Sequence, residues 1–151
     1  MIRPYRNADI EAILDIWEQA SRVAHHFLAD EFLAVERQNI RDKYIPAAQT
    51  WVWEDDGGPQ GFMSLVGFEV GAIFVRPHQH NRGIGRALMD TAFSLHDYLE
   101  LDVFEANSIG RRFYDRYGFT RVDRYIHDET GQPMLKLHRS NSAGGRRCES
   151  G

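Results

Sequence analysis

The stretch VRPHQHNRGIGRAL, residues 75–88, joins a strand-like segment to a helix-like segment through a loop with two glycines. Glycines let the backbone approach a ligand closely, and the first N–H groups of the following helix have no partner within that helix. These N–H groups and the positive end of the helix dipole point at one place, which favours an anion. The stretch therefore predicts a pyrophosphate cradle around Arg82, Gly83, Ile84 and Gly85, with added charge from Arg82 and Arg86.

Two common nucleotide-binding motifs do not fit this loop. The dinucleotide fingerprint requires a third glycine three residues after Gly85, where Leu88 stands. The P-loop requires a lysine followed by serine or threonine after a glycine, and the stretch has neither. A different phosphate-binding motif must account for the loop.

The loop resembles the pyrophosphate-binding motif of the GNAT superfamily of N-acetyltransferases, Gln/Arg-x-x-Gly-x-Gly/Ala, which follows a strand ending in Val-x-Pro. A second stretch, NSIGRRFYDRYGF at residues 107–119, is similar to the family signature Asn-x-x-small-x-x-Phe-Tyr-x-x-x-Gly-Phe. The resemblance extends from Met1 to about Arg139 and is closest to small bacterial members called YjaB-like. The chain departs from the family pattern at His80, where Gln or Arg is usual, and at Asn81, where glycine is frequent.

Hydrophobic periodicity indicates alternating strands and helices along the chain. We expect helices over 10–20, much of 23–44, 83–95 and 109–117, and strands over 2–6, 51–53, 61–66, 69–76, 99–105, 119–125 and 134–138. The order strand, helix, strand around the loop implies a parallel pair. Together with the resemblance, this order implies an α/β fold with a mixed, strongly twisted sheet of about six to seven strands. About four helices flank that sheet, and its central parallel strands splay apart.

The length of 151 residues suits one domain with one substantial core. We expect a single acetyltransferase domain over residues 1–139 and a polar, disordered tail over residues 140–151. The lone cysteine, Cys148, lies in that tail, so no intrachain disulfide can form. The chain shows no secretory leader and no apolar stretch near eighteen residues, which favours a cytoplasmic protein without membrane contact.

The net charge of −4 argues against a nucleic-acid partner. Within this acidic chain, a basic cluster stands in and around the loop and suggests a small anionic ligand: Arg76, His78, His80, Arg82 and Arg86. The two histidines also raise the question of a metal, but no Cys, Asp or Glu lies nearby in sequence to complete a ligand set. We therefore expect no metal.

The resemblance implies acetyl-CoA as co-substrate and a set of residues that hold it. The backbones of Phe74 and Val75 would pair with the pantetheine arm, and Asn107 would bond the cofactor's amides. The pyrophosphate would be held by His80, Arg82, Gly83, Ile84, Gly85 and Arg86. Asn107 is also a common helix N-cap residue, and the two roles can coexist.

The reaction that the resemblance implies is direct attack of a neutral amine on the thioester in a ternary complex. Tyr114 is our candidate general acid for the departing CoA thiolate, since a phenol with a pKa of ~10 lies close to a thiol with ~8.5. The alternative is that Tyr114 only packs beside Phe113. Because other residues already supply the apolar face of this helix, we favour the catalytic role.

The general base stays open among Glu69, His25, His26 and water. Glu69 stands six residues before Val75, where histone-acetylating relatives carry a base glutamate, but a solvated strand-start residue explains it equally well. For the adjacent histidines we favour one packed and one solvated side chain over a catalytic role.

The acceptor is a primary amine, either on a small molecule or on a protein lysine or N-terminus, and its choice is expected to depend on residues 23–44. A non-catalytic acyl-CoA-binding or regulatory module with the same fold is the alternative function. A homodimer through an exposed strand also stays open, since no residue points to it.

Overall fold

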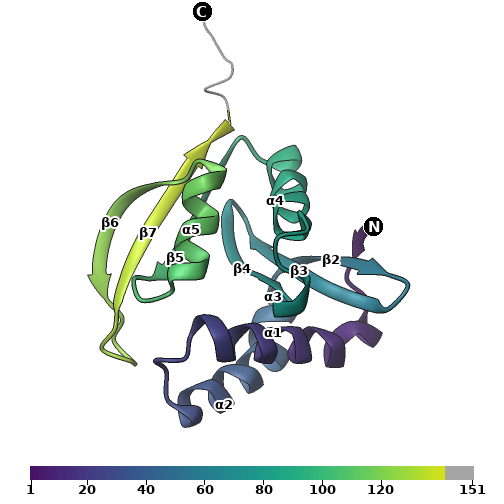
Figure 1. The fold of residues 1–151 in the computed structure, drawn as a ribbon, viewed down its shortest axis with the longest axis horizontal. Helices are drawn as coiled ribbons and strands as arrows, with labels where there is room; N and C mark the ends of the chain where they lie inside the picture. Colours follow the sequence, from purple (N-terminus) through teal and green to yellow (C-terminus); the bar gives the residue numbers. More distant parts are fainter. Residues whose placement is uncertain (142–151) are drawn as a thin grey trace, which may run out of the picture.

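The structure is a computed structural model that describes residues 1–141 (Figure 1). Seven strands form one mixed sheet in the order β1-β2-β3-β4-β5-β7-β6. Their bounds are β1 Ile2–Pro4, β2 Gln49–Asp55, β3 Gly58–Val66, β4 Glu69–Val75, β5 Tyr98–Phe104, β6 Thr120–Ile126 and β7 Pro133–Ser140. Among the strands of residues 1–141, only β4 and β5 pair in parallel. The expected mixed α/β sheet is confirmed.

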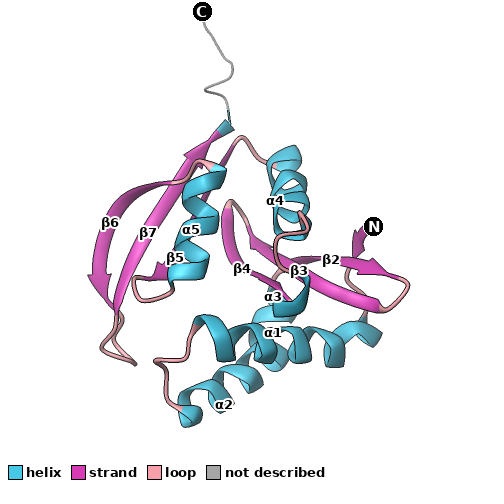
Figure 2. Cartoon of the chain, viewed as in Figure 1, coloured by secondary structure: helices cyan, strands magenta, loops and turns pink. Residues whose placement is uncertain are grey.

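Four helices of ten or more residues flank the sheet: α1 Ile10–Ala24, α2 Asp30–Asn39, α4 Ile84–Leu95 and α5 Ser108–Tyr117. Shorter helical turns are η1 Asn7–Asp9, the π-helical η2 Ile40–Tyr44, α3 Ile45–Ala47 and η3 Pro77–Gln79. In Figure 2, α5 lies in front of the β5–β7 strands and α4 stands next to β3 and β4, whereas α1 and α2 run beneath the sheet. Two apolar clusters result, one against α4 and one against α1.

The sheet is split between β4 and β5. These strands share one residue pair, Glu69 with Glu100, next to a hydrogen bond from the Glu100 N–H to the Phe68 carbonyl. Beyond this point the two strands diverge, as Figure 1 shows. The edge of β4 that faces β5 therefore lacks a strand partner from Val70 to Val75, and the predicted splaying of the central strands is confirmed.

A β-bulge in β4 decides which side chains face which helices. Ala72 pairs with Ser64 and Val70 pairs with Leu65, so Gly71 has no counterpart in β3. A bulge of this kind interrupts the strict alternation of side chains along a strand. The outcome is a division into Val70, Ile73 and Val75 on the α4 side, and Ala72 and Phe74 on the α1 side.

The C-terminal boundary lies beyond the expected one. Ser140 pairs with Tyr98 as the last residue of β7, and the Asn141 N–H donates to the Asp97 carbonyl. Because β5 begins at Tyr98, its partner strand continues past Arg139. The disorder expected for 140–151 is thus wrong for the first two residues, and 142–151 lie outside the described residues. Within residues 1–141, no helix is long and apolar enough to cross a membrane.

An ion cluster fixes the first strand to the start of α1 and to β2. Both terminal nitrogens of Arg3 donate to the Asp9 carboxylate, at 2.8 and 2.9 Å, and its Nε donates to Glu54 at 2.6 Å. Asp9 is buried. Arg3 holds the pKa of Asp9 below its usual value, although burial opposes this shift.

We predict that Asp9→Asn lowers the free energy of unfolding by about 3 kcal/mol at pH 7, because it leaves Arg3 without its buried partner. The folded pKa of Asp9 lies below its unfolded value of about 3.9, so the stabilisation is complete above about pH 5. It is lost as pH falls through the folded pKa. Urea denaturation at pH 7 and pH 3 measures both effects.

The matched control is Glu11→Gln, which removes an exposed carboxylate paired with Arg41. We expect a change below about 1 kcal/mol, as for other surface ion pairs. Equal losses for the two variants at pH 7 would contradict the role given to Asp9.

Candidate active site

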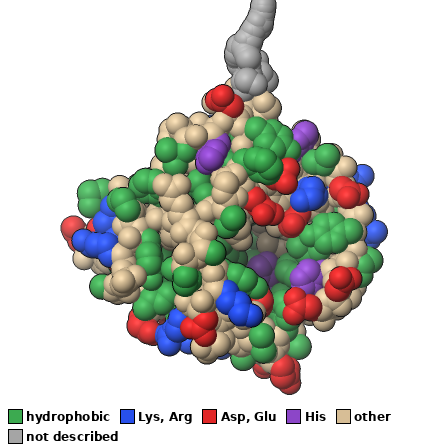
Figure 3. All heavy atoms as spheres, turned by 180° about the vertical axis from the view of Figure 1, so that it is seen from behind, with side chains coloured by type: hydrophobic (Ala, Val, Ile, Leu, Met, Phe, Trp, Pro, Cys, Tyr) green, Lys and Arg blue, Asp and Glu red, His purple; other side chains and the backbone are tan. Residues whose placement is uncertain are grey.

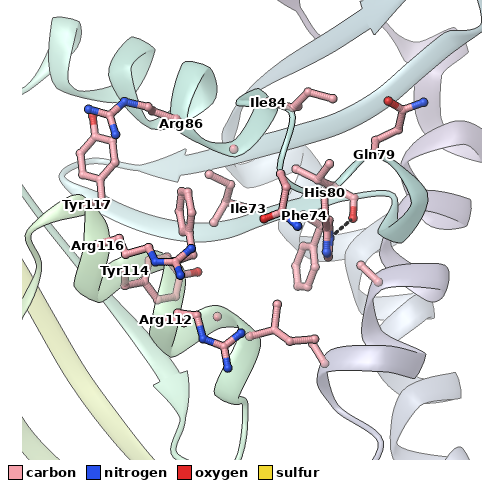
Figure 4. Close-up of a pocket in the computed structure, with 18 of the residues that line it drawn as sticks. Ile73, Phe74, Gln79, His80, Ile84, Arg86, Arg112, Tyr114, Arg116 and Tyr117 are labelled. Carbon is pink, nitrogen blue, oxygen red and sulfur yellow. Dashed lines mark hydrogen bonds between the residues drawn. The ribbon is translucent and has the colours of Figure 1, made fainter.

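The split between β4 and β5 opens into a pocket of about 470 Å³ (Figure 4). Its walls are the end of β4, the loop before α4, the first turn of α4, one side of α5 and the end of α1. The predicted site residues that line this pocket are Phe74, Val75, His80, Gly83, Ile84, Gly85, Arg86, Asn107 and Tyr114. Arg82 and Glu69 do not line it.

Two residues of the loop adopt left-handed backbone conformations. Asn81 has φ 65° and Gly83 has φ 84°. Asparagine is among the few residues other than glycine that tolerate this region, which explains how Asn81 replaces the glycine frequent in the family. Gly83 is the N-cap of α4 and offers no side chain to cap it. The N–H groups of the first turn are therefore left open on the pocket side, as an anion site requires.

Close packing against α5 requires a glycine at Gly85. A Cβ atom built on Gly85 would lie 3.2 Å from Cε1 of Phe113. The ring of this α5 residue therefore packs directly on the backbone at the start of α4. The second glycine of the motif thus holds the two helices close together at the pocket.

The side chains of Arg82 and His80 have internal partners. Arg82 donates to Oε1 of Gln79 at 2.7 Å. The Nε2 atom of His80 lies 3.0 Å from the carbonyl oxygen of Val75 and must be the donor, since a carbonyl only accepts. His80 thereby binds the last residue of β4, and Arg82 fixes the buried Gln79 beside it.

Asn107 caps α5 and is buried at the base of the pocket. Its Oδ1 accepts from the Gly110 N–H at 2.9 Å, which confirms the N-cap role. Its Nδ2 lies 3.4 Å from Nε2 of His25. This cap also explains why the family signature has a small residue at Gly110, because a Cβ there would lie 2.6 Å from Nδ2 of Asn107.

His25 is packed among aromatic rings at the end of α1, whereas His26 is exposed, so one histidine is packed and the other solvated. The His25 ring makes edge-on contacts with Phe74 of β4 and Phe104 of β5, at centroid distances of 6.2 and 5.3 Å. Burial lowers the pKa of His25 to about 4. Its Nε2 accepts from Asn107, so in the neutral ring the proton resides on Nδ1.

Tyr114 packs and faces the pocket at the same time. Its ring makes edge-on contacts with Phe113 and Phe119, at centroid distances of 5.4 and 5.8 Å. Its hydroxyl points into the pocket in Figure 4 and forms no hydrogen bond with any of residues 1–141. Burial raises the pKa of Tyr114 above the ordinary value of a phenol. The hydroxyl is therefore a protonated, unengaged donor at neutral pH.

Glu69 does not share the pocket with Tyr114. It lines a second cavity of about 320 Å³, together with Glu36, Tyr44 and the β4 residues Gly71 and Ala72. The two cavities lie on opposite faces of β4, because Ala72 borders the second and Ile73 borders the first. Across the described part of the chain, no group of three or more His, Cys, Asp or Glu side chains is arranged to hold a metal.

The acetyltransferase (GNAT) domain family matches residues 46–121 of this sequence. The chain belongs to the GNAT family of N-acetyltransferases. Peptidyl-lysine N-acetyltransferase YiaC of Escherichia coli is 37% identical over 134 residues, which cover 88% of this chain and 92% of YiaC. The enzyme class expected from the resemblance is therefore confirmed.

Solved structures agree with this GNAT assignment. The solution structure of apo YjaB from Escherichia coli superimposes with a TM-score of 0.82 at 30% identity, covering 91% of this chain and 95% of YjaB. PaiA N-acetyltransferase from Thermoplasma acidophilum, solved in complex with coenzyme A, shares the fold with a TM-score of 0.75 at 16% identity. That match covers 93% of this chain and 98% of PaiA.

Sequence reasoning did not assign several residues that line this GNAT pocket, among them Gln79, Ile109, Arg112 and Arg116. Arg112 and Arg116 stand four residues apart on a predicted helix, a spacing that puts them on one side and could have revealed them. Ile109 of the same helix is 36% exposed and lines the pocket.

We predict that Gly110→Ala destabilises the wild-type chain by about 1 kcal/mol, because the new Cβ displaces the capping amide of Asn107. In an Asn107→Ser chain the shorter side chain still caps the helix, so the same change should stabilise by up to about 1 kcal/mol through helix propensity. Urea unfolding of the four proteins gives the coupling energy. Equal effects in both backgrounds would refute this account of Gly110.

Proposed function

We propose that this GNAT enzyme transfers an acetyl group from acetyl-CoA to lysine side chains of proteins. The observation that carries the proposal is the unpaired edge of β4, which runs into the uncapped start of α4 within one pocket. The names of YiaC and YjaB, both peptidyl-lysine N-acetyltransferases, support a lysine acceptor.

The residues of the pocket fit the co-substrate. The open N–H groups at Ile84, Gly85 and Arg86 would hold the pyrophosphate at the positive end of α4. The free backbone groups at Phe74 and Val75 would pair with the pantetheine arm, as an added strand pairs with a sheet edge. Gly83 would leave the helix start open, and Asn107 would present its Nδ2 to an amide of the cofactor. His80 and Arg82 would fix the loop.

The pocket side chains also fit the chemistry of acyl transfer. Acetyl-CoA supplies an activated acyl group as a thioester, so the chain has to polarise its carbonyl and stabilise the leaving sulfur. Unpaired N–H groups of β4 are suited to the first task. Tyr114 is suited to the second, because its hydroxyl is protonated and has no internal partner. The raised pKa makes Tyr114 a weaker acid, so we propose that it first stabilises the sulfur as a hydrogen-bond donor and gives up its proton to the sulfur as the C–S bond breaks.

The acceptor side of the split is acidic. Glu69, Glu100 and Asp102 lie on neighbouring strands, and the ammonium of Lys136 is 3.3 Å from Asp102 and 3.7 Å from Glu100. Glu36 shares the second cavity with Glu69. Figure 3 shows acidic side chains beside a hollow on this face of the molecule. Several carboxylates against one ammonium favour a cationic acceptor such as lysine over a neutral or anionic amine.

We assign the removal of the acceptor's proton to Glu69, acting through water. It lies at the closed end of the split, three residues from Ala72 and thus about 10 Å from it along the strand. We therefore do not place Glu69 in direct contact with the attacking amine. His25 is less suited, since its Nε2 accepts from Asn107 and its pKa of about 4 makes it a weak base.

We predict that Tyr114→Phe lowers kcat by about 100-fold or more, the usual contribution of a general acid. The dissociation constant for acetyl-CoA should stay within about twofold, because the ring still packs against Phe113 and Phe119. Release of CoA thiol with a lysine peptide and calorimetric binding measure the two quantities. Tyr5→Phe, at a tyrosine that does not line the pocket, is the control. Unchanged turnover of Tyr114→Phe would contradict its role.

We predict that Glu69→Gln lowers kcat/KM for a lysine peptide by about tenfold or more, because the amine loses both its proton acceptor and an attracting charge. Affinity for CoA should not change, since Glu69 lies outside the CoA pocket. Glu11→Gln removes an equal charge from an exposed position on α1 and should leave both constants unaltered. The assignment fails if Glu69→Gln keeps wild-type kcat/KM between pH 6 and 9.

A further inference from the structure

Three arginines border the CoA pocket without a carboxylate partner. Arg86 comes from α4, and Arg112 and Arg116 come from α5 (Figure 4). Within residues 1–141, none of the three forms an ion pair or a hydrogen bond. The Arg86 guanidinium lies over the Tyr117 ring, 5.8 Å from its centre. Three unneutralised cations thus line one pocket of a protein with net charge −4.

Neighbouring arginines are engaged differently. Arg76 pairs with Asp15, Arg82 donates to Gln79, and Arg111 donates to the Glu105 carbonyl. Arg86, Arg112 and Arg116 differ from these neighbours in lining the pocket without such a partner in the described part of the chain.

Helix stability explains the position of only one of these three arginines. Arg116 lies in the last turn of α5, where a positive charge is favourable. Arg112 lies in the middle of that helix and gains nothing from its dipole. Arg86 is the third residue of α4, where the positive end of the helix disfavours a cation. An anion that binds between the two helices would offset this repulsion.

The two helices are close enough to share one such anion. Phe113 of α5 packs on the backbone of Gly85, the residue before Arg86. Arg112 and Arg116 are four residues apart and project from the same side of α5. The three guanidinium groups therefore border the region next to the open start of α4, where the pyrophosphate is proposed to bind.

We propose that Arg86, Arg112 and Arg116 bind the 3′-phosphate of CoA and make the enzyme distinguish CoA from 3′-dephospho-CoA. This inference rests on the proposed function, which places CoA in the pocket. Besides its pyrophosphate, CoA carries one phosphate monoester, with a charge between −1.5 and −2 at neutral pH. Guanidinium groups bind such a group through paired, charge-assisted hydrogen bonds. Arg112 and Arg116 lie on α5 and are not part of the glycine-loop motif.

The test is calorimetric binding of CoA and of 3′-dephospho-CoA to the full chain, in low salt. We expect the wild type to bind CoA at least about tenfold more tightly, a factor that one charge-assisted hydrogen bond can supply. The Arg112→Gln/Arg116→Gln double variant should bind the two ligands about equally, through loss of affinity for CoA alone. Raising the salt concentration should reduce the wild-type ratio, because these groups are exposed.

Arg111→Gln is the matched control, since Arg111 is an exposed arginine of the same helix that does not line the pocket. It should keep the wild-type ratio. Equal binding of the two ligands by the wild type would overturn the inference, and so would a double variant that loses affinity for both ligands alike. If the wild type bound neither ligand, the proposed function itself would fail.

Discussion

The single residue pair between β4 and β5 is the constraint on which the rest of the site depends. A sheet that stayed paired along its length would satisfy the backbone of β4 and leave no room for a ligand between its central strands. Here the strands part after Glu69 and Glu100, and side chains connect the halves instead. The ring of His25 contacts Phe74 on one half and Phe104 on the other. The split is thus held by packing, while its backbone edge stays free.

Two helices begin at this pocket, and their different N-caps give them different roles. Gly83 leaves the start of α4 open, so its N–H groups can bind an anion. Asn107 closes the start of α5 with its own side chain, and that helix carries Tyr114. The first helix therefore offers a binding site, and the second a fixed frame for a side chain. Close packing of Phe113 on Gly85 joins the two.

The charges of the protein are divided between the two sides of the split. Within residues 1–141, unpaired arginines of α4 and α5 border the pocket proposed for CoA, whereas Glu69, Glu100 and Asp102 lie on the other side with Lys136 among them. The bulge at Gly71 contributes to this division, because it breaks the alternation of β4 between the two faces. An anionic co-substrate and a cationic acceptor would each meet complementary charge, from opposite sides of one sheet.

The sequence by itself determined the features that depend on neighbours along the chain. The glycine loop, the helix that follows it, and the positions of Asn107 and Tyr114 were predictable, because helix starts and caps are set within a few residues. Only the tertiary structure decided that Arg82 binds Gln79 instead of lining the pocket, and that Glu69 lies in a separate cavity. The physical reason is that side-chain direction depends on contacts between segments far apart in sequence, which no local pattern records.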